Sequence, residues 1–519
     1  MAGAGGLAAM HSSGPPSRGA ETEPGFDPRW QAHVDTGIYP PRTHLFLDDH
    51  HVEDSDNVRR LVHCPTKVSP RPLFRHEMPW EGVSVVFRNS VIYDASDRVF
   101  KLWYRGYDPK LKSVSHSRWC LATSSDGLHW ERPQLGAVAF GGSKRNNIIS
   151  FGEQNDHNAL LHNVVRDDRE ENPARRFKAI GMDAHPVQAG DIEVPYLKKT
   201  GFKTAGGLFA AYSADGVHWR MRPGWLAGMF LRDGSTLHGW NHEQRRWVLW
   251  QRPAYRRGIR MIGVSYSQDF ERWSVPEMGL VPDDTDPQGM QFDQLTSVAS
   301  SDGGYIGLLS ASGWSGRGFS SGEEMPQLVY SRDPRSWTRV SREMFIKPGS
   351  KGAWDEGTVI PANPIVVGDD VYCFYYGKNA GGAWGEPTND GRGITTSALG
   401  LAKMRRDRWV SMSPTGKDGI LTTSDVFFSG DQLRVNVDAS RGSLRAELVD
   451  YHGQPVEPYT LANCQPITGD VMDHQVTWKT GGARFTSSVG TAKQHPPEVS
   501  RCLRIRFALD QADLFSFSC

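Results

Sequence analysis

The sequence predicts an all-β protein that consists of a five-bladed β-propeller followed by a C-terminal β-sandwich. Two observations lead to this prediction. A short signature that runs from a serine through an aspartate to a tryptophan recurs about five times along the chain. Helical periodicity is weak throughout, whereas short apolar runs bounded by turn residues are frequent. Repeated β-units of this kind bury their apolar faces by stacking against one another.

The signature predicts one β-hairpin in each repeat. Its first two copies are residues 124–130 (SSDGLHW) and 213–219 (SADGVHW). Further copies occupy 267–273 and 331–337, and a degenerate one occupies 405–409. Each copy follows an apolar run, and we expect a short polar strand after it. In such a turn the aspartate accepts hydrogen bonds from turn amides, and the tryptophan packs back across the hairpin.

A second pair of apolar segments precedes each signature, so each repeat should contain four strands. Units of about 60 to 75 residues then form a ring of five blades. This assigns residues 26–414 to the propeller. Residues 1–25 are rich in Gly, Ala, Ser and Pro and are expected to form a disordered tail.

After Pro414 the signature stops and a different strand pattern begins. Residues 415–519 are therefore interpreted as a β-sandwich, whose expected role is to brace the propeller. Strands are expected at 420–428, 432–437, 444–450 and 502–509.

Composition excludes several classes of function. Lysine plus arginine and aspartate plus glutamate both total 59, so the formal net charge is zero, which argues against a nucleic-acid partner. No apolar run approaches the roughly 20 residues of a membrane-spanning helix, so no membrane partner is expected. The six cysteines show no metal-binding spacing, which predicts free thiols in a reducing compartment and a cytoplasmic location. No EF-hand-like or histidine-based spacing indicates a metal, and a propeller needs no cofactor. Homo-oligomerisation is left open.

Acidic residues recur just before the predicted innermost strand of each blade, where all of them would face one central channel. They are Glu81, Asp156, Asp233, Asp293 and the pair Asp355 and Glu356. Converging carboxylates raise some pKa values while others stay ionised. Glycoside hydrolysis needs one protonated acid and one carboxylate, so this pattern predicts such chemistry. The alternative is that the acids cap the inner strands by accepting amide hydrogen bonds.

Other residues near these acids are candidates for substrate binding. Trp80 and Trp354 each adjoin a candidate acid and would stack on a sugar ring, although core packing explains them equally well. Arg105 and His157 would bind substrate hydroxyl groups or keep a carboxylate ionised, and the alternative is a surface or structural role. Asp293, Asp355 and Glu356 complete the predicted substrate-binding set.

Several segments carry a family resemblance. They are 45–49 (LFLDD), 79–82 (PWEG), 91–94 (VIYD), 100–106 (FKLWYRG) and 512–517 (ADLFSF), together with the hairpin signature. In these segments the chain resembles the five-bladed glycoside hydrolases of families 32, 43 and 68, and most closely the uncharacterised bacterial family-32-like proteins.

The resemblance implies a nucleophile or base, a transition-state stabiliser and a general acid from the first three blades. By blade order these are Glu81, Asp156 and Asp233. Two motifs depart from the family pattern. Residues 87–90 (FRNS) stand where invertase-like enzymes have Asn-Asp-Pro-Asn-Gly, so Glu81 would replace the missing acid from a neighbouring position. Residues 232–234 (RDG) match the Arg-Asp-Pro motif only in part.

The expected function is therefore that of a glycoside hydrolase or transglycosylase that acts on a furanoside or another small glycoside. Carbohydrate is the expected partner. A non-catalytic carbohydrate-binding propeller is one alternative, because the same acids could accept hydrogen bonds from sugar hydroxyls. A glycoside phosphorylase is another, indicated by the basic run 252–260 (RPAYRRGIR), which could hold phosphate.

Overall fold

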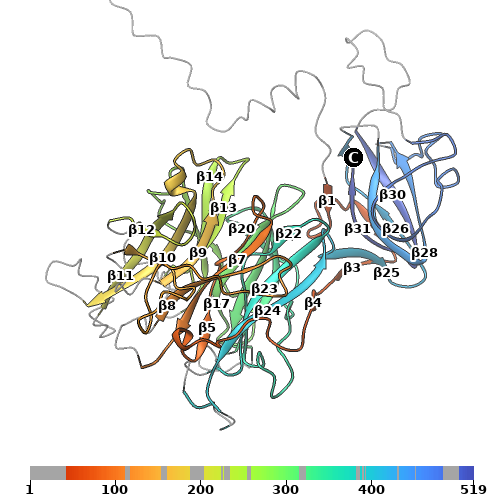
Figure 1. Cartoon of the computed structure of the whole chain (residues 1–519). Helices are drawn as coiled ribbons and strands as arrows, with labels where there is room; N and C mark the ends of the chain where they lie inside the picture. Colours follow the sequence, from red (N-terminus) through yellow and green to blue (C-terminus); the bar gives the residue numbers. More distant parts are fainter. Residues whose placement is uncertain are drawn as a thin grey trace, which may run out of the picture.

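The structure is a computed structural model of the chain. It describes residues 43–110, 117–152, 160–186, 204–223, 226, 234–253, 259–314, 323–381, 386–388, 391, 393–428, 432–450, 452–482 and 502–519. Within these ranges nearly all regular structure is β-strand (Figure 1), and the helices are two 3-10 turns, Pro79–Glu81 and Pro173–Arg175. The all-β prediction is confirmed. No helix in the described part of the chain is long and apolar enough to span a membrane.

The described strands between residues 84 and 405 form four sheets, and we number five consecutive groups of strands within them as repeats 1 to 5. Repeat 1 contains β5 (Ser84–Val86), β6 (Val91–Asp94), β7 (Val99–Tyr107) and β8 (Ser117–Ser124). Repeat 2 contains β9 (Leu160–Arg166), β10 (Phe177–Pro186), β11 (Thr204–Ser213) and β12 (Trp219–Met221). Repeat 3 contains β13 (Thr236–Asn241), β14 (Arg246–Gln251), β15 (Ile262–Ser267) and β16 (Glu277–Leu280).

Repeats 4 and 5 form one continuous sheet. Repeat 4 contains β17 (Gln291–Ala299), β18 (Tyr305–Ser312), β19 (Glu324–Asp333) and β20 (Ser336–Arg339). Repeat 5 contains β21 (Thr358–Pro361), β22 (Ile365–Val367), β23 (Asp370–Lys378), β24 (Ser397–Arg405) and, from the start of the chain, β4 (Thr66–Lys67). The two repeats are joined where Glu324 of β19 pairs in parallel with Thr358 of β21. Most neighbouring antiparallel strands follow one another along the chain, as the predicted hairpins require, and β5 with β7 and β21 with β23 are exceptions.

Asparagine side chains, of which Asn89 and Asn163 are buried and Asn363 is half-buried, join the inner strands of the five repeats. Asn89 Nδ2 donates to Asn163 Oδ1 at 3.2 Å and to the Leu237 carbonyl oxygen at 2.9 Å. Asn89 Oδ1 accepts from the Asn363 amide at 2.8 Å, and Asn363 Oδ1 accepts from the Ser297 amide at 3.0 Å. These five residues belong to repeats 1, 2, 3, 5 and 4, so the network brings all five inner strands together. A closed ring of five blades stays a prediction.

The turn chemistry predicted for the signature is confirmed. Asp126 Oδ1 accepts from the amides of Leu128 and His129, both at 2.8 Å, and Trp130 Nε1 donates to the Gly127 carbonyl oxygen at 3.1 Å. Gly127 has φ 77°, a conformation that glycine adopts without strain. In repeat 1, β5 and β6 both pair with β7 and together hold the innermost position. Each turn thus follows the third position of its sheet, at β8, β11, β15 or β19, and lies at the opposite end from the start of the inner strand.

The degenerate fifth copy differs from the other four, and the prediction of a hairpin there is wrong. The strand that follows it, β25 (Val410–Pro414), pairs with β3 (Val58–Val62) and with β31 (Asp513–Ser518) in another sheet. The outer position beside β24 is filled by β4 instead. The backbone groups of β24 are thus paired by a strand from the other end of the chain.

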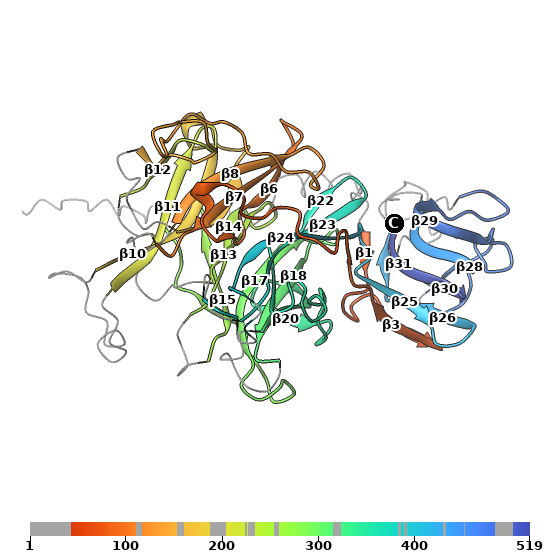
Figure 2. The same ribbon diagram turned by 60° about the horizontal axis from the view of Figure 1, so that its bottom comes forward.

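The remaining strands form a ten-stranded sheet within the described residues, next to the repeats in both views (Figures 1 and 2). Besides β3, β25 and β31, its strands are β1 (Thr43–Leu45), β2 (Asp54–Asp56), β26 (Asp418–Thr422), β27 (Val426–Phe427), β28 (Arg434–Val449), β29 (Ile467–Gln475) and β30 (Cys502–Asp510). The segments expected as two strands, 432–437 and 444–450, lie in the single strand β28, whose first half pairs with β31 and whose second half pairs with β30. The sandwich architecture and the boundaries at residues 25 and 414 stay predictions.

Candidate functional site

The candidate site lies at one end of the repeats, where the first and innermost strand of each repeat begins. We call this end the mouth. Six charged residues from four repeats gather there, and we call them the mouth cluster. They are Arg88, Arg252, Arg260, Asp293, Glu324 and Lys378. The ladder of strand pairs sets much of this arrangement, because Ser312 pairs with Glu324, Glu324 with Thr358, and Thr358 with Lys378.

Asp293 is the most deeply buried carboxylate of the mouth cluster. It lies at a β-bulge in β17, where the register shifts between Phe292 and Gln294, and it is 2% exposed. Its Oδ1 accepts from Arg252 Nη1 at 2.9 Å and from Arg260 Nη1, and its Oδ2 accepts from Ser312 Oγ at 2.6 Å. Asp293 therefore connects repeat 4 to repeat 3. The ends of the basic run that indicated a phosphate site are held by this carboxylate.

Lys378, Glu324 and Arg88 bring charges from repeats 5, 4 and 1 to the mouth. Burial lowers the pKa of Lys378, the negative charge of Glu324 opposes this shift and the positive charge of Arg88 adds to it, so that the pKa is about 8. Arg88 Nη1 also donates to Gln294 Oε1 at 3.1 Å. The mouth thus holds a lysine with a lowered pKa within the field of an arginine and a glutamate.

The mouth also contains buried polar atoms that have no hydrogen-bond partner in the structure described. They are Ser84 Oγ, Ser235 Oγ, the amide Oε1 and Nε2 of Gln251, Ser310 Oγ and Thr395 Oγ1. Each of these side chains is at most 2% exposed. Ser84 begins β5, Ser235 immediately precedes β13, and Gln251 ends β14. Buried polar groups in folded proteins nearly always bind protein, water or ligand, so this set indicates a place for polar ligand atoms.

Glu81 ends the 3-10 turn Pro79–Glu81, just before β5 of repeat 1, and none of its hydrogen bonds within the described residues reaches the mouth cluster. It is fully buried, and its carboxylate accepts from the amides of Glu77 and Met78 at 2.7 and 2.9 Å. It also accepts from Tyr104 Oη at 2.5 Å and from Arg132 Nε at 2.8 Å. Burial raises the pKa of Glu81, but the hydrogen bonds from Arg132, Tyr104 and the two amides bring it below its usual value. These contacts favour the capping alternative, and a catalytic role for Glu81 stays a prediction.

Asp355 and Trp354 also have well-defined partners. Asp355 is 3% exposed, and its Oδ2 accepts from Lys67 Nζ at 2.6 Å and from Tyr375 Oη at 2.9 Å. The Trp354 ring stacks on Tyr375 with 5.7 Å between ring centres and an interplanar angle of 16°. Lys67 belongs to β4, so this group of contacts fastens the start of the chain to repeat 5.

Trp80 is held by contacts within repeat 1. Its Nε1 donates to Asn147 Oδ1 at 2.8 Å, and its ring meets Phe140 edge to face at 6.0 Å. Arg105 lies with its guanidinium 5.8 Å from the Tyr107 ring centre, and Glu356 accepts from the Gly352 amide. A role in substrate binding for these side chains stays a prediction.

The remaining predicted residues, Asp156, His157 and Asp233, lie outside the described residues. Asp156 and His157 fall in the connection that precedes β9, and Asp233 falls in the connection that precedes β13. Gly234, the next residue after Asp233, has φ 96° and lies against the mouth cluster. A Cβ atom there would lie 2.3 Å from the Asp293 carbonyl oxygen and 3.3 Å from the Arg252 guanidinium carbon. The chain directly after Asp233 therefore contacts Asp293.

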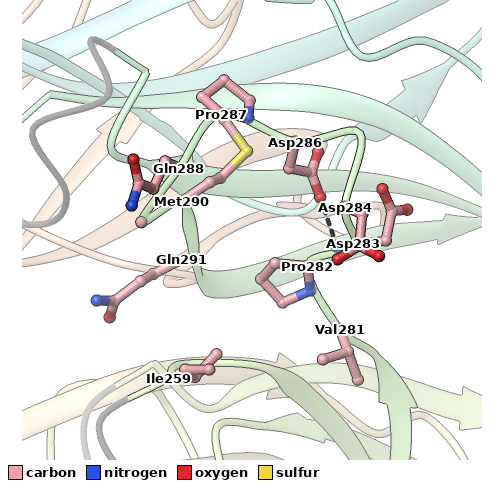
Figure 3. A pocket seen from close by; sticks show the side chains of 11 residues that line it. Ile259, Val281, Pro282, Asp283, Asp284, Asp286, Pro287, Gln288, Met290 and Gln291 are labelled. Atoms are coloured by element: carbon pink, nitrogen blue, oxygen red, sulfur yellow. Dashed lines mark hydrogen bonds between the residues drawn. The ribbon is translucent and has the colours of Figure 1, made fainter.

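A cavity of about 380 Å³ lies beside the mouth, between Ile259 and the connection from β16 to β17 (Figure 3). Three aspartates line it, but two of them are ion-paired. Asp286 Oδ1 accepts from Arg339 at 2.8 Å and from Arg342 at 2.7 Å, and Asp283 Oδ2 accepts from Arg342 at 2.6 Å. Asp286 also accepts from the Asp283 amide at 2.9 Å, as the dashed line in Figure 3 shows. These contacts hold the connection in place and leave no matched pair of acids for catalysis.

The described residues show no group of three or more histidine, cysteine, aspartate and glutamate side chains arranged to hold a metal ion. Cys64, Cys120, Cys373, Cys464 and Cys519 form no disulfide bond with one another.

Sequence reasoning missed most of the mouth. It did not single out Arg88, Glu324, Lys378 or Gln251, which lie in or beside apolar strands. One signal was available for the central network, because Asn89 precedes Asn163 by 74 residues, and Asn163 in turn precedes its partner Leu237 by 74. That spacing matches the length of the predicted repeat. It occurs, however, in only two of the four intervals that separate successive residues of the network.

No protein-family model matches the chain, and no curated protein matches it. Solved structures resemble it at low identity. A β-1,2-mannobiose phosphorylase from Listeria innocua gives a TM-score of 0.42 at 13% identity, covering 66% of this chain and 96% of that one. A glycosyl hydrolase from Bacteroides ovatus gives 0.42 at 13% identity, covering 66% and 93%. A thermostable family-43 glycoside hydrolase gives 0.41 at 13% identity, covering 64% and 94%. Such values do not establish a shared activity.

Proposed function

We propose that the protein is a carbohydrate-active enzyme, a glycoside hydrolase or transglycosylase that binds a furanoside or another small glycoside at the mouth. In this proposal residues 26–414 form a five-bladed propeller that a C-terminal β-sandwich braces. The observation that carries the proposal is the set of unpaired buried hydroxyl and amide groups at the mouth. Sugars present many hydroxyl groups, each of which can donate and accept, and thus match such a lining.

The mouth cluster supports an assignment of the acids. Asp156 and Asp233 directly precede two inner strands, and Gly234 lies against Asp293. We therefore assign the acid and nucleophile or base roles to Asp156 and Asp233. Asp293 holds Arg252 and Arg260 in position. Glu81, whose carboxylate is occupied within repeat 1, is assigned a structural role.

The experiment that tests this proposal measures turnover of aryl furanosides and of small oligosaccharides. We expect Asp156→Asn and Asp233→Asn each to lower turnover by about 100-fold or more, because each removes a proton donor or acceptor. The exposed Asp284 is the control, and Asp284→Asn should leave turnover unchanged. Full turnover in both test variants would contradict the proposal. Binding without product on prolonged incubation would favour a carbohydrate-binding protein instead.

Phosphorolysis is the second candidate, and the mouth cluster favours it for one reason. Four of its six members are cationic, and Arg252 and Arg260 bind a single carboxylate between them. A phosphate ion could be held by such groups. Turnover that requires inorganic phosphate and releases a sugar 1-phosphate would support this reading, and turnover that phosphate leaves unchanged would exclude it.

We also propose that the protein acts in the cytoplasm without a cofactor and without a nucleic-acid or membrane partner. The zero formal net charge and the free thiols support this proposal. Fractionation of source cells would test the location, and recovery of the protein outside the soluble cytoplasmic fraction would contradict it.

A further inference from the structure

Ser235 and Gln251 share one face of the repeat 3 sheet. Thr236 pairs with Trp250, so Ser235 and Gln251 are the next opposed positions of the ladder. Side chains alternate along a strand, and therefore Ser235 lies on the side of Leu237 and Gln251 on the side of Leu249. Both leucines pack in a cluster with Ile180, Leu208 and Ala210 of repeat 2. The two polar side chains thus face repeat 2, at the mouth end of that interface.

The polar atoms on this face are unpaired, although all are buried. Ser235 is 2% exposed and Gln251 is 1% exposed, and in the structure described neither the serine hydroxyl nor either amide atom has a hydrogen-bond partner. Ser265, which pairs opposite Leu249, lies one position deeper and has an unpaired hydroxyl as well. A buried amide that makes no hydrogen bond loses its interactions with water without compensation.

The opposite face of the same strands is satisfied. Thr236 Oγ1 donates to the Leu295 carbonyl oxygen, and Trp250 Nε1 donates to Ser297 Oγ at 2.6 Å. Both bonds reach repeat 4. The strands therefore supply partners for their polar groups at one interface and leave them without partners at the other. A general looseness of repeat 3 does not explain this difference, whereas a ligand on the repeat 2 side does.

We propose that Ser235 and Gln251 form a subsite that binds two neighbouring hydroxyl groups of a neutral saccharide. The amide Nε2 would donate to one hydroxyl oxygen, and Oε1 would accept from the adjacent hydroxyl, while Ser235 Oγ can donate or accept. Ser235 directly follows Gly234, which lies against Asp293 and Arg252, so the subsite adjoins the mouth cluster. The inference rests on the proposed function, because it assigns part of the substrate to named side chains.

The test measures saccharide binding and thermal stability without any turnover. Saturation-transfer NMR would be recorded with D-fructose, D-mannose, D-galactose and L-arabinose on the wild type, Gln251→Met and Ser235→Ala. Ser300→Ala is the matched control, because Ser300 Oγ is also buried and unpaired but lies beyond the far end of β17. Methionine has nearly the shape of glutamine without its polar atoms, so the fold should be kept.

We expect the wild type and the control to bind at least one of the four sugars, and both test variants to bind it about 10-fold or more weakly. We also expect Gln251→Met to raise the melting temperature of the sugar-free protein by roughly 1 to 3 °C, since it removes an unpaired buried amide. Unchanged sugar binding in Gln251→Met would overturn the inference, and so would a wild type that binds none of the four sugars. A melting temperature that falls in Gln251→Met while sugar binding stays unchanged would indicate that the Gln251 amide binds ordered water and not a sugar.

Failure of the proposed function would be recognised separately. A protein that binds sugar through Gln251 but turns over no glycoside would keep the subsite and remove the enzymatic assignment.

Discussion

Glu81 and Asp293 are both buried carboxylates paired with arginine, yet they connect different parts of the molecule. Glu81 takes all its partners from residues 77–132, which form repeat 1 and the segment before it. Asp293 takes its arginines from repeat 3 and its serine from repeat 4. The first carboxylate fixes one repeat internally, and the second links two repeats at the mouth. Burial and ion pairing are therefore common to both carboxylates, and the position of their partners is what differs.

The largest effect is expected from removing the Glu81 carboxylate. Glu81→Ala removes the acceptor of Arg132 Nε, of Tyr104 Oη and of two backbone amides, so we expect the free energy of unfolding to fall by about 3 to 5 kcal/mol. Urea unfolding measures this change. Glu77→Ala removes a half-exposed partner of the same arginine and should cost at most about 1 kcal/mol. An unchanged unfolding free energy together with lost turnover would restore the catalytic assignment of Glu81.

Removing the Asp293 charge should affect turnover more than stability. We expect Asp293→Asn to lower turnover by about 100-fold, because Arg252 and Arg260 lose the carboxylate that positions them. The unfolding free energy should fall by about 1 to 3 kcal/mol. Asp286 binds two arginines outside the mouth cluster, so Asp286→Asn should give a similar loss of stability with normal turnover. Equal turnover in the two variants would remove the functional distinction.

The buried Lys378 should make stability rise at alkaline pH. Its pKa is about 8 in the folded state and near the usual 10.5 when unfolded, so the unfolded chain binds more protons between these values. The contribution of Lys378 to the unfolding free energy therefore increases from pH 8 to 10.5. Lys378→Met should raise stability at pH 7 and remove that increase.

Lys403 provides the contrast for this pH experiment. Its pKa is raised, because its bonds to Asp370 and Tyr372 outweigh the opposing effect of burial. Its stabilising contribution is thus complete below pH 10.5 and is lost as the pH rises through the folded-state pKa. Lys403→Met should lower stability at neutral pH. Urea midpoints measured from pH 7 to 10 check both signs, and parallel curves for the two variants would contradict them.

The smallest effect is expected at the hairpin turns. Burial raises the pKa of Asp215, but hydrogen bonds from the His218 side chain and from two turn amides outweigh this effect, so that the pKa is about 2. Its contribution is present above pH 3.8 and is lost as the pH falls through about 2. Asp215→Ala should cost about 1 kcal/mol at pH 7, as the loss of a helix N-cap does, and nothing below pH 2. A turnover defect in this variant would place the turns nearer the site than the strand order indicates.

The all-β fold class and the turns could be predicted because their signals are local. The signature carries its own hydrogen bonds, with Asp126 and Asp215 each accepting from amides two and three residues later. The fifth copy shows where this reasoning ends. Its turn sequence is followed by an apolar strand that either a neighbouring hairpin or a distant sheet could accept, and β3 and β31 accept it.

The candidate site was predictable only in outline. The spacing of the acids selected Asp293 as a residue just before an inner strand, and in the structure it lies within β17. The same rule selected Glu81 and Asp355, whose carboxylates are bound by Arg132 and Lys67. Sequence spacing shows where a residue falls in the repeat. It does not show which side chain from a distant part of the sequence binds that residue in the folded chain.

By itself the sequence determined the β-rich repeat and the chemistry of its turns, because these depend on bonds between residues two to three positions apart. Only the tertiary structure decided which polar groups share the mouth. Asp293 is hydrogen-bonded to Arg260, which is 33 residues away in the sequence, and Asn363 to Asn89, which is 274 residues away. The unpaired amide of Gln251 is likewise visible only in the folded chain, because an unpaired state depends on every neighbour that packing brings within reach.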